Sequence, residues 1–136
     1  MGLKYFDFDC ELECKKPKCL IINSYDNYIG FSISYSKYKS KNKNFDHILI
    51  NRKDIIEKLI PALKDKTTDN IFIPCMCGDE LLSIYTMDNM VCLILYDNYF
   101  LKHKRRKLSD SCILSFKESD MLSRALQVIV NDMNEV

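Results

Sequence analysis

Two stretches of closely spaced basic residues offer the clearest chemistry in this chain. Lysine and arginine side chains bind phosphate groups, and nearby aromatic rings give flat faces on which unpaired bases can stack. We therefore predict that the chain binds single-stranded nucleic acid through two basic loops and adjacent aromatic residues. The predicted binding residues are Lys37, Lys39, Lys41, Lys43, Lys102, Lys104, Arg105, Arg106, Lys107, Tyr28, Tyr38 and Tyr99.

The overall charge does not favour nucleic acid, so this prediction depends on the local clusters alone. The 136 residues include 20 Lys and Arg and 19 Asp and Glu, which leaves a formal net charge of +1. Charged hairpin ends are also a common solubilising feature of sheets. One face of the first expected strand would repel phosphate, because it carries Asp7, Asp9, Glu11 and Glu13.

The seven cysteines could in principle supply metal ligands. Cys10 and Cys14 share a strand face, and so do Cys75 and Cys77. Four thiolates could hold zinc, but these spacings differ from the Cys-x-x-Cys pairs of zinc ribbons. Because cysteine is also a common small core residue, we expect no bound metal and no other cofactor.

Catalytic motifs are not evident in the sequence. It contains no nucleophile elbow, P-loop or HExxH helix, and His47 and His103 stand far from any paired catalytic residue in the sequence. An enzyme needs a nucleophile with a base, or paired carboxylates in a cleft. We therefore expect a binding protein and not an enzyme.

The compartment is predicted from three features of the sequence. No apolar run approaches the length of a membrane span, and the first residues do not resemble a secretory signal. The odd number of cysteines argues against a disulfide framework and favours reduced thiols. We expect an intracellular protein, cytoplasmic or nuclear, that does not contact a membrane.

Alternating and helical patterns divide the first half of the chain into four strands and a helix. The strands are expected at residues 6–14, 19–24, 28–38 and 47–50, since apolar residues recur there with the two-residue period of a strand. Asn51 is a candidate N-cap, with Asp54 in the first helical turn. An apolar stripe follows at Ile56, Leu59, Ile60 and Leu63, and Pro61 is expected to kink or shorten this helix.

The second half repeats this pattern. The pair Asp88 and Asn89 follows Asp26 and Asn27 at an offset of 62, and Ser115 with Glu118 forms a capping box in register with Asn51. We predict an α+β fold with antiparallel sheets, built as a tandem duplication of a ββββα unit with one helix packed per unit. The two repeats are residues 1–66 and 67–136, which together form one compact domain.

The second long strand is apolar on both faces. Its outer positions are Cys92, Ile94 and Tyr96, where the first long strand has Gly30, Ser32 and Ser34. A strand that is apolar on both faces is normally covered on both. We predict an interface at Cys92, Ile94 and Tyr96, either with the other half of the chain or with a second copy in a homodimer.

The sequence DNYIGFSI at residues 26–33, then a basic stretch, HILI at 47–50 and a helix, resembles the repeat of purine-rich-element-binding (PUR) proteins. Whirly proteins and the positive-cofactor transcriptional coactivators have a similar layout. The resemblance implies two intertwined repeats whose sheets bind single-stranded DNA or RNA, with a transcriptional or RNA-related role. The second copy departs from the pattern, since Cys92 stands where Gly30 does.

Two functions are consistent with these patterns. The first is a single-stranded DNA- or RNA-binding protein that uses the paired basic loops and the aromatic residues of the sheets. The alternative is a protein–protein interaction module, such as a viral or parasite accessory protein, that acts through a self-associating sheet without binding nucleic acid. The doubly apolar strand around Ile94 motivates the alternative.

Overall fold

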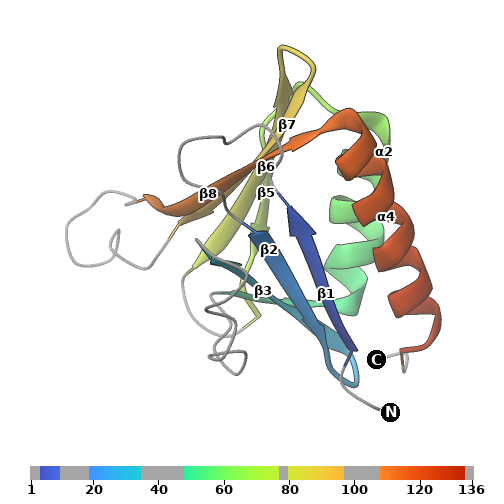
Figure 1. The fold of residues 1–136 in the computed structure, drawn as a ribbon. Coiled ribbons are helices and arrows are strands. Elements are labelled where there is room, and N and C mark those ends of the chain that lie inside the picture. The colour runs from blue at the N-terminus through green and yellow to red at the C-terminus, as the bar shows by residue number, and fades with distance from the viewer. Residues whose placement is uncertain (1–3, 10–18, 35–47, 77–79, 97–107, 134–136) are drawn as a thin grey trace.

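A computed structural model of the chain describes residues 4–9, 19–34, 48–76, 80–96 and 108–133. These residues form two antiparallel four-stranded sheets and two helical segments (Figure 1). The predicted α+β class and the predicted antiparallel pairing are therefore confirmed. The parts of the predicted strands at residues 10–14 and 35–38 lie outside the described residues.

Sheet A comes first in the chain, and its strands follow one another in space as they do in sequence. Its strands are β1 (Lys4–Asp9), β2 (Cys19–Ser24), β3 (Tyr28–Ser34) and β4 (Ile48–Asn51). The last strand runs without a loop into a helical segment, which comprises α1 (Arg52–Asp54), the π-helical turn η2 (Ile55–Leu59) and α2 (Ile60–Asp65).

Sheet B has the same strand order and also runs directly into a helix. Its elements are β5 (Ile71–Pro74), β6 (Leu81–Met87), β7 (Met90–Tyr96), β8 (Leu108–Ser115) and α4 (Phe116–Asn131). A two-residue turn joins β6 to β7, and both of its residues have positive φ, 52° at Asp88 and 62° at Asn89. Asp and Asn tolerate this region, and such turns match the twist of a hairpin.

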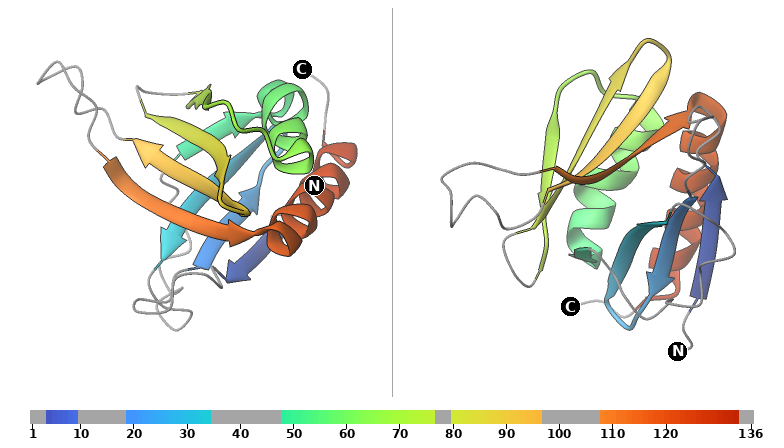
Figure 2. Two further views of the ribbon diagram at one scale, coloured as in Figure 1. Left: turned by 90° about the horizontal axis from the view of Figure 1, so that it is seen from above. Right: turned by 60° about the vertical axis from the view of Figure 1, so that its left-hand side comes forward.

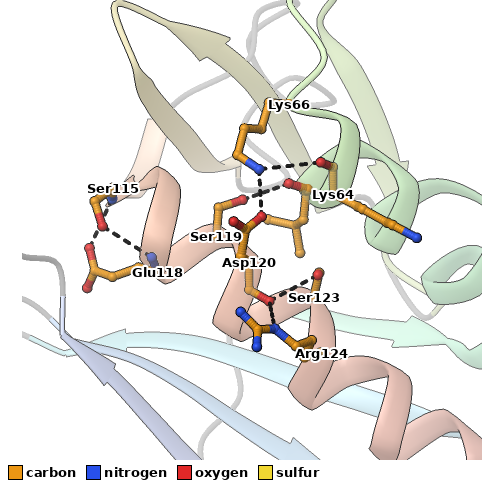
Figure 3. Close-up of polar contacts among 9 residues, drawn as sticks. Lys64, Lys66, Ser115, Glu118, Ser119, Asp120, Ser123 and Arg124 are labelled. Atoms are coloured by element: carbon orange, nitrogen blue, oxygen red, sulfur yellow. Dashed lines mark hydrogen bonds and ion pairs between the residues drawn. The ribbon is translucent and has the colours of Figure 1, made fainter.

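The starts of both helical segments are capped as predicted. The Asn51 side-chain oxygen accepts a hydrogen bond from the Asp54 amide at 2.8 Å. At the start of α4 the Glu118 amide donates to Ser115 Oγ at 3.1 Å, and the Ser115 amide donates to Glu118 Oε1 at 3.0 Å (Figure 3). These side chains satisfy amides that have no partner within the helix.

Pro61 does not end the first helical segment, which continues to Asp65. The turn before it is π-helical instead, and the Ile60 amide donates to the Ile55 carbonyl five residues earlier. Proline cannot donate to the carbonyl four residues back, and its ring collides with that carbonyl in a regular α-helix. The wider π turn accommodates Pro61 without breaking the helix.

The two sheets cross each other, and α2 and α4 lie side by side along one side of the molecule (Figures 1 and 2). The inner faces of both sheets and the facing sides of the helices bury one continuous apolar core. Burying a Leu or Ile side chain stabilises a fold by about 1.5–3 kcal/mol before the entropy of ordering is counted. Large side chains in this core include Ile22, Ile29, Phe31, Ile50, Leu63, Ile84, Leu93, Leu114, Leu122 and Leu126.

Polar contacts fix how the two helices lie against each other. Ser119 Oγ donates to the Leu63 carbonyl at 2.9 Å, and Lys66 Nζ contacts Asp120 Oδ1 at 2.6 Å (Figure 3). At the other end of the helix pair, Arg52 Nε donates to the Val130 carbonyl at 3.2 Å. These contacts join residues 54 to 78 positions apart, so they hold the two halves of the chain together.

Sheet A is also joined to the chain just beyond β5. The Leu49 amide donates to Cys75 Sγ at 3.3 Å, and the Met76 amide donates to the Leu49 carbonyl at 2.7 Å. The outer edge of β4 is therefore covered at Leu49 by a segment of the second half. An exposed strand edge would invite pairing with another chain.

No helix among the described residues is long and apolar enough to cross a membrane.

Replacing Ser115 with Ala should lower the free energy of unfolding by about 1 kcal/mol, because the capping box loses its side-chain acceptor. Urea denaturation followed by circular dichroism would measure this change. Lys117→Ala, an exposed change in the same helical turn, is the control and should alter stability by less than about 0.5 kcal/mol. Equal effects of the two substitutions would contradict a stabilising cap.

Candidate functional site

The outer face of sheet B is an uncharged surface with partly exposed aromatic rings. Alternate residues of its strands point away from the core, because paired residues across neighbouring strands share a face. The strand pairing aligns Phe72 with Ser83, Ile94 and Ser111 in one row. The face consists of Phe72, Pro74, Leu81, Ser83, Tyr85, Met87, Met90, Cys92, Ile94, Tyr96, Ser111 and Ile113, none of them charged.

Exposure differs across this face. Phe72 is 53% exposed and Met87 is 49% exposed, while Tyr85, Ile94 and Tyr96 are half-buried. Ser83 is buried, and its hydroxyl is hydrogen-bonded to the side-chain oxygen of Asn70. The surface therefore presents apolar and aromatic groups to solvent around a satisfied polar centre.

The predicted interface residues Cys92, Ile94 and Tyr96 all lie on this face. Cys92 is 7% exposed, since it is flanked by its own sheet neighbours, whereas Ile94 and Tyr96 remain half-buried. The structure places the three residues together on β7.

Tyr85 and Cys92 face each other across β6 and β7. The pKa of Tyr85 is raised, first because the negative charge of a deprotonated Cys92 disfavours a second negative charge beside it. Burial raises this pKa further, and so does the hydrogen bond that holds the tyrosine proton against the Cys92 sulfur. The cluster joins a phenol and a thiol in the middle of the aromatic face.

The two predicted basic loops lie outside the described residues, but their points of attachment do not. The first, residues 35–47, joins β3 to β4, and the second, residues 97–107, joins β7 to β8. Both β4 and β8 run directly into helices, so both connections attach at the ends of the strands remote from α2 and α4 (Figure 2). Lys102, Lys104, Arg105, Arg106 and Lys107 thus belong to the connection between the paired residues Tyr96 and Leu108.

Tyr28 is the one predicted nucleic-acid-binding residue that the structure describes, and it lies away from this region. It begins β3, whereas the first basic connection follows Ser34 at the other end of that strand. A seven-residue strand spans roughly 20 Å. One face of the Tyr28 ring is also covered by Tyr25, with 4.7 Å between the ring centroids. Lys37, Lys39, Lys41, Lys43, Tyr38 and Tyr99 lie outside the described residues.

A hollow lies at the start of the first helical segment. Sequence patterns did not indicate it. It has a volume of about 630 Å³, and residues from three separate parts of the chain surround it. No short motif links these parts, so only the folded chain brings them together. The lining residues are Asn27, Asn51, Arg52, Lys53, Ile56, Glu57 and Met76.

The four cysteines that the structure describes fall into two groups. Cys19, Cys75 and Cys92 are buried thiols, whereas Cys112 is disulfide-bonded, which differs from the expectation of reduced thiols throughout. Within the described ranges no three His, Cys, Asp or Glu side chains are placed to hold a metal ion. Cys10, Cys14, Cys77, His47 and His103 lie outside those ranges.

Comparison with known proteins gives no match to the chain among protein-family models, curated proteins or solved structures.

Replacing Cys92 with Ala should lower the pKa of Tyr85 toward its ordinary value, since the largest cause of the raised pKa is removed. A raised pKa in the folded state also means that stability is lost as the pH rises from the usual tyrosine range through the folded pKa. NMR titration of ring-labelled tyrosine would follow the Tyr85 signal directly.

The matched control is Cys19→Ala, a buried cysteine in sheet A, which should leave the Tyr85 titration unchanged. An unchanged Tyr85 midpoint in Cys92→Ala would show that the two side chains do not interact as described.

Proposed function

We propose that the chain binds single-stranded nucleic acid across the outer face of sheet B. The observation that carries the proposal is the uncharged, partly exposed aromatic face that ends where the second basic connection is attached. Phe72, Tyr85 and Tyr96 offer ring faces to bases, and base–aromatic stacking contributes about 1–3 kcal/mol per base. The absence of carboxylates among the described residues of this face favours a polyanionic ligand.

The basic connections supply the phosphate-binding part of the proposal. Lys102, Lys104, Arg105, Arg106 and Lys107 follow Tyr96 in the chain, so cations are tethered at one end of the aromatic face. Lys37, Lys39, Lys41 and Lys43, with Tyr38, form the corresponding connection of sheet A, and Tyr99 belongs to that of sheet B. Tyr28 is left out of this site because of its place at the far end of β3.

We further propose that the two halves are tandem copies of one ββββα unit, residues 1–66 and 67–136. Each sheet has its strands in chain order and passes directly into a helix, which supports this reading. The same layout is what the resemblance to PUR-type and Whirly-like repeats implies. The chain would then act as a nucleic-acid-binding protein with a transcriptional or RNA-related role, and not as an enzyme.

A second candidate function is a protein-interaction module that self-associates through the same face. Ile94 and Tyr96 favour it, since uncharged apolar side chains at the centre of a sheet face are typical of the centres of protein interfaces. A homodimer formed through this face would hide the rings that the first candidate uses. The two functions therefore make different predictions for substitution of the aromatic residues of this face. The first predicts weaker oligonucleotide binding, and the second predicts loss of the dimer.

The combined substitution Phe72→Ala, Tyr85→Ala and Tyr96→Ala should weaken binding to single-stranded oligonucleotides by at least about tenfold, because stacking faces are lost. The dependence of affinity on salt should stay close to that of the original chain, since the phosphate contacts remain. Fluorescence anisotropy across a salt series, with labelled DNA and RNA strands, measures both quantities.

The control is Met121→Ala with Val128→Ala, two exposed apolar residues on α4, which should leave binding unchanged. Replacing Lys104, Arg105, Arg106 and Lys107 with Ala should instead weaken the salt dependence. Absence of binding at low salt, together with sedimentation as a dimer that the aromatic substitutions disrupt, would contradict the first candidate and favour the second.

A further inference from the structure

The hollow beside the first helical segment carries an inference that is independent of nucleic-acid binding by sheet B. Its walls come from the turn between β2 and β3, the junction of β4 with α1, the turn η2, and the segment after β5. Its volume of about 630 Å³ falls in the range of small-molecule sites. It is open to solvent, so a ligand could enter without a change of fold.

Two cations, Arg52 and Lys53, and one anion, Glu57, line this hollow. Arg52 and Lys53 form no ion pair among the described residues, where Lys58 pairs with Asp54 and Lys66 pairs with Asp120. The Arg52 Nε atom is used by the Val130 carbonyl at 3.2 Å, which anchors the guanidinium and leaves its terminal amino groups for a ligand. Two neighbouring cations match the charge of roughly −2 on one phosphate monoester.

Two of the backbone amides at this helix start are already occupied, so a ligand would have to be held mainly by side chains. The Arg52 amide donates to the Asn27 carbonyl at 3.0 Å. The Asp54 amide donates to the Asn51 side chain at 2.8 Å, as described above. The Arg52 and Asp54 amides are therefore not available to an anion, and its attraction to this site comes mainly from the Arg52 and Lys53 side chains.

The lining also includes two exposed apolar side chains. Ile56 is 36% exposed and Met76 is 46% exposed, and both line the hollow. Large apolar side chains gathered around a cavity provide a surface for a flat, weakly polar body. Thioether and aliphatic groups pack well against aromatic rings.

Polar groups complete the lining. Asn27 and Asn51 contribute amides, and Glu57 contributes a carboxylate that has no ion-pair partner among the described residues. A simple aliphatic anion would leave these groups unused. A ligand with hydroxyl groups could donate to Glu57, and one with ring heteroatoms could bond to the amides.

We propose that this hollow binds a nucleoside 5′-monophosphate. The phosphate lies between Arg52 and Lys53, the base packs on Ile56 and Met76, and the ribose hydroxyls donate to Glu57. This ligand joins one dianionic group, one apolar ring and several hydrogen-bonding groups, which is the combination that the lining offers.

The test is a titration of the intact chain with AMP, GMP, CMP and UMP, followed by NMR. Saturable shifts of the Met76 methyl group and of the amides of residues 51–57 are expected with at least one of them. Lys53→Glu should weaken this binding by about tenfold or more, since a charge-assisted contact is replaced by a repulsion. Lys64→Glu, the same charge change at an exposed position of α2 outside the hollow, should have no effect.

Ribose 5-phosphate separates the role of the base from that of the phosphate. It should bind more weakly than the nucleoside monophosphate, because it lacks the ring that packs on Ile56 and Met76. Equal affinities of the two compounds would overturn the assignment of a nucleoside. Absence of saturable shifts with every nucleotide at millimolar concentration would overturn the site as a whole.

Failure of mononucleotide binding in the hollow can be distinguished from failure of oligonucleotide binding on sheet B. Lys53→Glu should leave oligonucleotide binding by the aromatic face intact, and the combined Phe72, Tyr85 and Tyr96 variant should still bind the mononucleotide. Loss of mononucleotide binding in the aromatic variant, with its fold preserved by circular dichroism, would place the ligand on sheet B and contradict the proposed site.

Discussion

The two sheets and the two helical segments share a single apolar core, because β4 and β8 pass into helices without an intervening loop. Each sheet must turn its apolar side toward the helices, so the inner positions of both are fixed at once. Ile22, Phe31, Ile84 and Leu93 represent this inner layer. A single shift of strand register would move a whole set of apolar side chains to the wrong face. The outer faces and the remote strand ends are left for other contacts.

The outer faces then differ in a way that bears on function. On sheet A the outer positions of β2 are closed to solvent, with Ile21 4% exposed and Asn23 1% exposed. On sheet B the outer positions include the exposed Phe72 and the half-buried Tyr85. Two sheets with the same strand order can therefore present unlike surfaces. Among the described residues, the outer face of sheet B brings together Phe72, Tyr85 and Tyr96, whereas that of sheet A has Tyr28 at one end.

Local chemistry explains which parts of the fold the sequence predicts. The Asn51 and Ser115 caps, the alternation of β3 and β7 and the turn at Asp88 all depend on near neighbours in the chain. The effect of Pro61 was harder to foresee, since a proline can shorten a helix or be accommodated by a π turn. The disulfide at Cys112 also could not be inferred from the number of cysteines.

The sequence identified some residues of the candidate sites and missed others. The pattern of one strand was enough to place Cys92, Ile94 and Tyr96 on one face of β7, while an interface there stays a prediction. The separation of Tyr28 from the basic connection was already implied by the strand expected at residues 28–38, because an extended strand holds its two ends far apart. The hollow at Arg52 and Lys53 gave no sequence signal, since Asn27 and Met76 reach it only through tertiary structure.

We propose that single-stranded nucleic acid binds on the outer face of sheet B. Methyl NMR of the chain with a saturating single-stranded oligonucleotide tests it most directly, because isoleucine and methionine methyl groups report from both sides of the molecule. We expect chemical-shift changes at the methyl groups of Ile94, Ile113, Met87 and Met90, with the Met121 methyl group on α4 unaffected. Shifts confined to Met121, or none on sheet B at saturation, would contradict this placement of the ligand.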